Sequence, residues 1–138
     1  MIRVVLDTNI IVSALLQSLG PPAQVFVLGV GGTVQLCISG NVYAEYEEVI
    51  RRPRLRLHED TVASALQALR EKSFWVKPAE MVRACADPDD DMFLECAQTA
   101  RADYLVTGNI KDFPASWIDT QIITPRGFLE ILSREFPR

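Results

Sequence analysis

Strand-like and helix-like segments alternate along almost the whole chain, and this order constrains the fold more than any other feature of the sequence. Short apolar runs are typical of buried strands, and the longer segments between them repeat their apolar residues at the helical period. Because a parallel connection has to return along the sheet, such units build a mainly parallel sheet with helices on both faces. The pattern therefore predicts an α/β fold.

Local start and stop signals set the expected boundaries. Pro21 lies near the first position of one expected helix, Ser39 can cap another, and Asp87 with Pro88 opens a third that runs to about Ala100. Strands are expected at 2–6, 33–38, 74–77, 104–107 and 121–124. Helices are expected at 9–17, 21–30, 39–52, 59–72, 87–100 and from 125 onward. The central sheet therefore has four to five strands, since 74–77 is short.

The composition is that of one globular domain, expected over 1–138. The 138 residues, 49% of them hydrophobic, suffice for one core and are too few for two ordinary domains. No apolar run reaches the roughly 18 to 20 residues that cross a bilayer, and no basic leader precedes the first strand. We therefore expect a cytoplasmic protein with no membrane partner. Cys37, Cys85 and Cys96 are widely spaced, so we expect core fillers and neither a disulfide framework nor a zinc site.

The net charge of −4 argues against a protein that holds nucleic acid by bulk positive charge. It does not exclude a nuclease. Four acids gathered around divalent cations would leave the rest of the surface neutral, and basic patches there can still guide a phosphate backbone.

Asp7 directly follows the first apolar strand, in the sequence Asp7-Thr8-Asn9. In open α/β sheets, ligands bind beyond the carboxyl ends of the strands, where a short acid can reach a cation without being buried unpaired. An aspartate at this place can equally cap the helix after it, which is its commoner role. Taken alone, Asp7 leaves both roles open.

Further acids follow the neighbouring strands. Glu45 lies on the helix after Ser39, at the rim of its apolar face, and Asp112 follows the strand at 104–107. The carboxyl ends of parallel strands point the same way, so side chains placed there can meet although they are far apart in sequence. A solvated helix face remains the alternative for Glu45.

The segment Asp87-Pro88-Asp89-Asp90-Asp91 is the densest group of acids. Asp87 is the expected helix cap, and Asp89 and Asp90 complement the positive helix terminus. Asp91 is left over, and either a bound cation or simple solvation can compensate its charge.

An oxygen-only set of ligands, without His or Cys, selects a hard cation such as Mg²⁺ or Mn²⁺ over zinc. Such an ion activates water and stabilises charge on a phosphate, so no Ser, Cys or His nucleophile is needed. The residues thus indicate phosphoryl chemistry.

Four segments in order resemble the motifs of the PIN-domain ribonucleases, the family that includes the VapC-type toxins of toxin–antitoxin systems. They are 4–9, which ends in Asp7-Thr8-Asn9, then 39–49, 91–97 and 105–113. The resemblance covers nearly the whole chain. It implies a compact α/β/α domain that hydrolyses phosphodiester bonds in an RNA substrate with Mg²⁺ or Mn²⁺, a possible cognate antitoxin as partner, and a homodimer.

Carried over position by position, the resemblance implies a set of acidic catalytic residues that also bind the metal: Asp7, Glu45, Asp91 and Asp112. Asn109 stands where many relatives have Asp, so either Asn109 or Asp112 completes the metal site. Asn9 and Thr107 are expected to orient the ligating carboxylates. Asp89 and Asp90 match no single catalytic position and stay helix-end residues in this interpretation.

Basic residues gather at the end of the helix that carries Glu45, and they are candidates for contact with the substrate: Arg51, Arg52, Arg54 and Arg56. Complementing the helix C-terminus is the alternative role for them. Aromatic residues are not interleaved with them, so no base preference follows.

Competing functions fit the motifs less well. A phosphoacceptor receiver domain needs two adjacent acids after the first strand, and a dehalogenase-type phosphatase needs a second Asp at position 9, which is Asn. A catalytically silent PIN domain that binds RNA or protein is the remaining alternative, and Asn109 is its best support. The complete set of four acids favours a nuclease.

Overall fold

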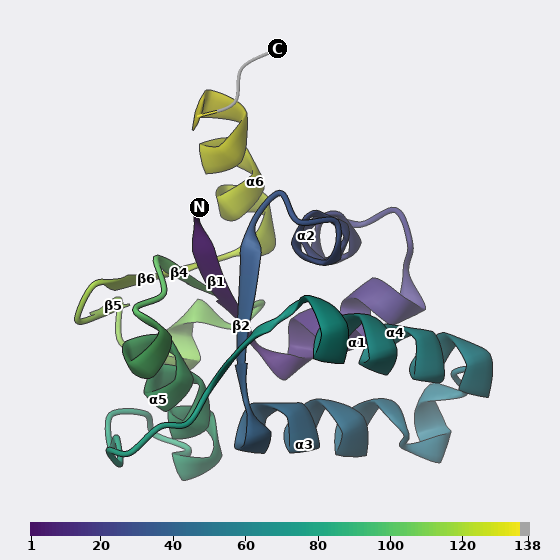
Figure 1. The fold of residues 1–138 in the computed structure, drawn as a ribbon, viewed down its shortest axis with the longest axis horizontal. Helices are drawn as coiled ribbons and strands as arrows, with labels where there is room; N and C mark the ends of the chain where they lie inside the picture. The colour runs from purple at the N-terminus through teal and green to yellow at the C-terminus, as the bar shows by residue number, and fades with distance from the viewer. Residues whose placement is uncertain (136–138) are drawn as a thin grey trace.

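A six-stranded sheet in the order β3-β2-β1-β4-β6-β5 runs through the centre of the computed structural model, which describes residues 1–135 (Figure 1). The strands are β1 (Arg3–Leu6), β2 (Gln35–Ser39), β3 (Phe74–Val76), β4 (Tyr104–Val106), β5 (Ser116–Trp117) and β6 (Thr120–Ile123). All neighbours are parallel except β5, which pairs antiparallel with β6. The mainly parallel sheet is confirmed. Four to five strands are expected from the sequence, and the strand missing from that expectation is β5. Its two residues are too few to show the alternation of apolar and polar residues that indicates a strand.

In the described part of the chain, six α-helices surround the sheet, and three short 3₁₀ turns connect elements. The helices are α1 (Thr8–Leu16), α2 (Pro21–Val30), α3 (Gly40–Ile50), α4 (Glu59–Lys72), α5 (Asp91–Ala100) and α6 (Pro125–Glu135). The 3₁₀ turns are η1 (Pro53–Leu55), η2 (Pro88–Asp90) and η3 (Ile110–Asp112). In Figure 1, α1, α2 and α4 lie on one side of β2 and α5 lies on the other, which confirms the α/β/α layers.

The helix expected from Asp87 begins later than predicted. Asp87 does cap, since its Oδ1 accepts a hydrogen bond from the Asp89 amide at 2.9 Å, but the element that it caps is the 3₁₀ turn η2. The α-helix starts only at Asp91.

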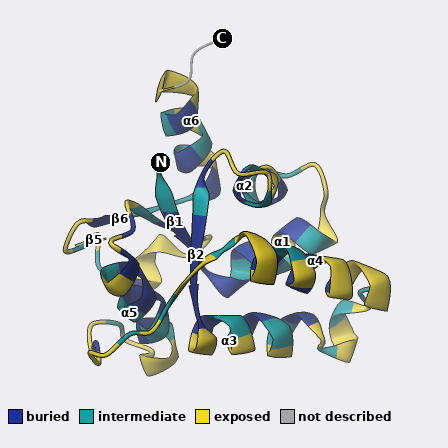
Figure 2. Ribbon diagram, viewed as in Figure 1, coloured by how far each residue is buried: buried dark blue, intermediate teal, exposed yellow. Residues whose placement is uncertain are grey.

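The core is continuous from the inner strands to the facing sides of the helices, as the dark blue central strands in Figure 2 show. Val4 and Leu105 are fully buried on the two central strands, and Cys37 and Cys96 are buried beside them, so these two cysteines are core residues as expected. Within residues 1–135, no single helix is long and apolar enough to cross a membrane. In the same range, only α1 and α2 together meet the length and composition, and they are bent by 104°.

Candidate functional site

The carboxyl ends of β1 and β4 bring Asp7 and Thr107 together. The amide of Asp7 donates to the carbonyl oxygen of Val106 over 3.0 Å, and the amide of Thr107 donates to that of Ile123 over 2.9 Å. The ladder therefore continues one residue past each strand. The expected meeting of strand ends, here from residues 100 positions apart, is confirmed.

The Asp7 carboxylate is buried, with 8% of the residue exposed, and two side chains orient it. Its Oδ2 accepts hydrogen bonds from the Thr107 hydroxyl at 2.7 Å and from the Asn9 amide nitrogen at 3.2 Å. Asn9 and Thr107 are held in turn by the backbone amides of Gly108, at 3.1 Å, and Asn109, at 3.0 Å. Asp7 stands at the N-cap position of α1 without a side-chain capping bond. Asp7 thus stands at the capping position, while its side-chain hydrogen bonds come from Thr107 and Asn9.

The charges of neighbouring acids act on Asp7 and on Asp90. Burial raises the pKa of Asp7, the Thr107 hydrogen bond opposes that rise, and the charge of Asp112 adds to it. Burial also raises the pKa of Asp90, to about 6, and the charges of Asp7, Asp87 and Asp112 raise it further. Asp7, Asp90 and Asp112 thus repel one another, and we call these three residues the acid cluster. Such repulsion is what a bound cation relieves.

The acid cluster is not drawn tightly together. Among residues 1–135, no three His, Cys, Asp or Glu side chains are close enough to share one metal ion. Its members come from three separate places, the end of β1, the turn η2 and the turn η3.

Glu45 lies beside the acid cluster, at the start of α1. Its Oε2 accepts a hydrogen bond from the Thr8 hydroxyl at 3.4 Å. Burial raises the pKa of Glu45, and the charges of Glu48 and Asp89 add to the rise. The buried hydroxyl of Tyr46 donates to the carbonyl oxygen of Leu6, so α3 is fixed to the end of β1. This bond places Glu45 near the strand end, as expected from its position at the rim.

Asp91 makes its side-chain hydrogen bonds to the segment before η2. Its Oδ1 accepts hydrogen bonds from the backbone amides of Ala84, at 3.0 Å, and Cys85, at 2.8 Å. Burial acts to raise the pKa of Asp91, but these bonds outweigh it and the pKa is lowered. Neither Asp7 nor Asp112 is among the charges that act on it. Asp90, expected only as a helix-end residue, is the acid of this segment on which the charges of Asp7 and Asp112 act, and the expected role of Asp91 as a metal ligand stays a prediction.

The helical spacing of the sequence favours Asp90 as the acid on the buried side of α5, whereas the family motif points to Asp91. Asp90 precedes the buried residues Phe93, Leu94 and Ala97 by three, four and seven positions, so it continues the apolar face of α5. Asp91 is offset from that face by about 100°, the angle between successive helical residues. Only one of the two can face the strand ends.

Asp112 and Asn109 are the two candidates for the residue that completes the metal site. Asp112 is exposed in η3, and its charge raises the pKa of both Asp7 and Asp90. Asn109 is also exposed, and its backbone amide supports Thr107. Asp112 is therefore the one that adds charge to the acid cluster.

Comparison with known proteins identifies the family. The family model of the PIN domain matches residues 3–111. The chain belongs to the PIN-domain family. It is also 26% identical, over 94% of this chain and 90% of the relative, to the uncharacterized protein MJ1680 of Methanocaldococcus jannaschii. The structure of VapBC2 from Rickettsia felis, bound to a DNA fragment from its promoter, has a similar fold: the TM-score is 0.57, identity is 15%, and 89% of this chain and 98% of that chain are covered.

The basic residues of this PIN domain lie at the end of α3 that points away from β2 (Figure 1). Arg51 forms ion pairs with Glu47 at 3.6 Å and Glu59 at 2.8 Å, and Arg52 pairs with Glu48 at 2.8 Å. These contacts favour the helix-end role for both arginines. Arg54 and Arg56 are exposed, and within residues 1–135 neither forms an ion pair, so they are the more accessible candidates for substrate contact.

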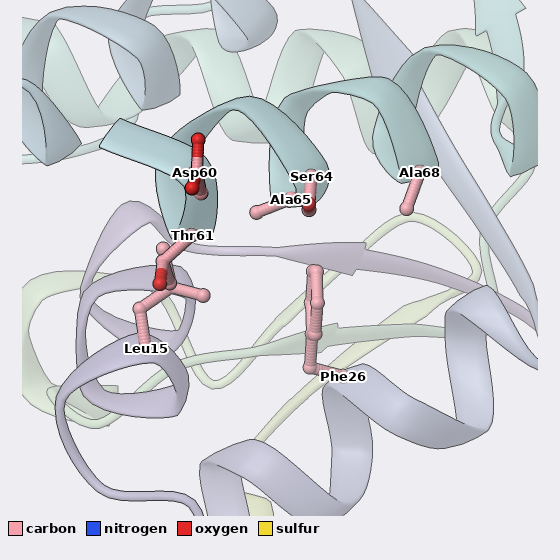
Figure 3. A pocket seen from close by; sticks show the side chains of 7 residues that line it. All are labelled: Leu15, Phe26, Asp60, Thr61, Ser64, Ala65 and Ala68. Atoms are coloured by element: carbon pink, nitrogen blue, oxygen red, sulfur yellow. The ribbon is translucent and has the colours of Figure 1, made fainter. Parts of the chain in front are cut away.

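A groove of about 490 Å³ lies between α1, α2 and α4 (Figure 3). Its lining is Leu15, Phe26, Asp60, Thr61, Ser64, Ala65 and Ala68. In Figure 3 the Phe26 ring and the α4 side chains face the same open space. None of the acid-cluster residues lines this groove, so it is separate from the candidate active site of the PIN domain.

Proposed function

We propose that this PIN domain is a metal-dependent endoribonuclease that hydrolyses phosphodiester bonds of RNA with water. The observation that carries the proposal is the acid cluster: Asp7, Asp90 and Asp112 come from three distant segments, the charge of Asp112 raises the pKa of both Asp7 and Asp90, and the charge of Asp7 raises that of Asp90 further. Uncompensated like charges at a ligand-binding edge indicate a site for a cation.

The donor set fits Mg²⁺ or Mn²⁺. Every candidate ligand offers carboxylate oxygen, and the groups that orient Asp7 are a hydroxyl and an amide. Asp7, Asp90 and Asp112 would hold the ion, with Glu45 as the neighbouring acid. When bound, such an ion lowers the pKa of water and stabilises charge on the scissile phosphate.

The protein's own residues prepare the site. Thr107 and Asn9 fix the rotamer of the Asp7 carboxylate, so Asp7 loses little freedom when it binds a ligand. Tyr46 holds α3, and with it Glu45, against the end of β1. Arg54 and Arg56 are exposed cations that can attract the RNA backbone, although their place at the far end of α3 limits them to phosphates away from the scissile bond.

The test is cleavage of labelled single-stranded RNA with Mn²⁺, with Mg²⁺ and with EDTA. We expect cleavage by the wild type only with metal, and a loss of at least about 100-fold in Asp7→Asn and Asp90→Asn. Glu130→Gln, an exposed acid on α6, is the matched control and should cleave normally. Cleavage in EDTA, or full activity in both acid-cluster variants, would overturn the proposal. RNA binding without cleavage under every condition would instead support the silent PIN domain, whose best support remains Asn109.

We further propose that the protein is the toxin of a toxin–antitoxin pair in the cytoplasm and forms a homodimer. The likeness to the fold of VapBC2 supports this role. Expression of the wild type alone should arrest growth, and co-expression of a small protein encoded beside it should relieve the arrest. If expression of the active enzyme leaves growth unchanged, the toxin role is wrong even where the nuclease is confirmed. Sedimentation of the purified protein checks the dimer.

A further inference from the structure

Residues 77–87, between β3 and η2, contain no helix or strand, so no helix or sheet hydrogen bonds of their own hold this segment in place. Two carboxylates of α5 hold it through its backbone amides. Glu95 Oε2 accepts from the amide of Val82 at 3.0 Å, and Asp91 Oδ1 accepts from the amides of Ala84 at 3.0 Å and Cys85 at 2.8 Å. Asp91 and Glu95 are four residues apart and lie on one side of the helix. Together they fasten the segment to α5.

The fastened segment leads directly into the turn that carries Asp90. Val82 is buried in the core, and from there the chain runs through Cys85 to Asp87, which caps η2 by accepting the Asp89 amide. Asp90 and Asp91 both have α-helical backbone angles, so their side chains diverge by about 100°. While the backbone of 84–85 holds Asp91, Asp90 is the residue on which the charges of Asp7 and Asp112 act.

We propose that Asp91 is a positioning residue: by binding the amides of Ala84 and Cys85, it fixes the start of α5 so that Asp90 enters the acid cluster. Glu95 supports it through Val82. This role of Asp91 rests on the proposed function in one respect, since it takes the acid cluster to be the metal centre. If Asp91 acts as a hydrogen-bond acceptor, the variants Asp91→Asn and Asp91→Ala should behave differently from the case in which Asp91 is a metal ligand.

Asp91→Asn separates the two roles. An asparagine keeps the side-chain oxygen that can accept from both amides, but its neutral amide is a poor ligand for a hard cation. Asp91→Ala removes the acceptor and leaves two backbone amides without a partner. If Asp91 positions Asp90, the asparagine variant should resemble the wild type and the alanine variant should not.

The first measurement is amide hydrogen exchange without metal or RNA. We expect faster exchange at Ala84 and Cys85 in Asp91→Ala, together with faster exchange at Asp89 and Asp90 in the turn. Asp91→Asn should keep most of the protection. Unchanged exchange at Asp89 and Asp90 in Asp91→Ala would overturn the positioning role. If Asp91→Ala does not fold, Glu95→Ala and Glu95→Gln repeat the comparison through the Val82 amide.

The second measurement is Mn²⁺ affinity by calorimetry, with RNA cleavage beside it. Loss of a group that orients a ligand costs about 10–100-fold in metal affinity or activity, and we expect this range for Asp91→Ala. Asp91→Asn should lose less than about 5-fold, while Asp90→Asn should lose the affinity of a ligand. A loss in Asp91→Asn as large as in Asp90→Asn, with the amides of 84–85 still protected, would make Asp91 a ligand. If the wild type neither binds Mn²⁺ nor cleaves RNA, the proposed function fails, and the exchange pattern alone decides the role of Asp91.

Discussion

Asp90→Asn should make the metal-free protein more stable while it removes the proposed activity. The pKa of Asp90 rises from its usual 3.8 to about 6, first through burial and then through the charges around it. At 1.36 kcal/mol per pH unit, this rise corresponds to at most about 3 kcal/mol of unfavourable energy in the ionised, folded protein. Solvent screening reduces that value, because Asp90 is only partly buried, and the variant also loses a favourable interaction of about 0.3–1 kcal/mol with the helix start. We expect a net gain of about 1 kcal/mol at neutral pH.

The pH dependence has a definite sign. A raised pKa means that the folded protein binds the Asp90 proton more tightly than the unfolded chain does. The stability from this group is therefore fully present below the usual value of 3.8 and is lost as the pH rises through about 6. The advantage of Asp90→Asn over the wild type should appear over this window and level off above it.

Urea denaturation in EDTA, at several pH values between about 4 and 8, measures this effect. Glu130→Gln is the control for removing an exposed acid. Added Mn²⁺ should reverse the order, since an ion at 100 times its dissociation constant stabilises the wild type by about 2.7 kcal/mol and the variant by less. The argument that Asp90 carries uncompensated charge would be refuted by one result. In that result, Asp90→Asn is less stable than the wild type in EDTA at neutral pH, and the difference in stability does not change between pH 3.8 and about 6.

Two further changes test the supports of the fold and the site. Thr107→Val removes the 2.7 Å hydrogen bond from the fully buried Thr107 to Asp7. The affinity for Mn²⁺, measured by calorimetry, should therefore fall by about 10–100-fold. Unchanged affinity would mean that Thr107 does not orient the Asp7 carboxylate. Gly29→Ala would place a methyl group 2.5 Å from Cγ of the buried Leu36. We expect the free energy of unfolding in urea to fall by about 1–3 kcal/mol. A variant as stable as the wild type would show that α2 can move away from β2.

Most of the fold could be predicted because its signals are local. The proline at position 21 and the apolar period place α2 at the residues where the structure has it, and the same period places α4 correctly. Ser39 caps α3 by accepting the Val42 amide at 3.2 Å, as its position before the helix predicts. The strand β5 could not be predicted, since its two residues form a strand only by pairing with β6.

The sequence by itself determined the order of elements and the edge at which ligands would bind, because these follow from chain direction in parallel strands, and the resemblance to the PIN-domain family implied the grouping of Asp7 with Thr107 and Asn9. It did not decide which acid at the start of α5 joins them. That choice depends on how the helix start is rotated about its axis, and this rotation is set by the hydrogen bonds that the backbone of 84–85 donates to Asp91, along a path fixed by core packing at Val82. Only the tertiary structure contains those contacts, and it is on Asp90, not on Asp91, that the charges of Asp7 and Asp112 act.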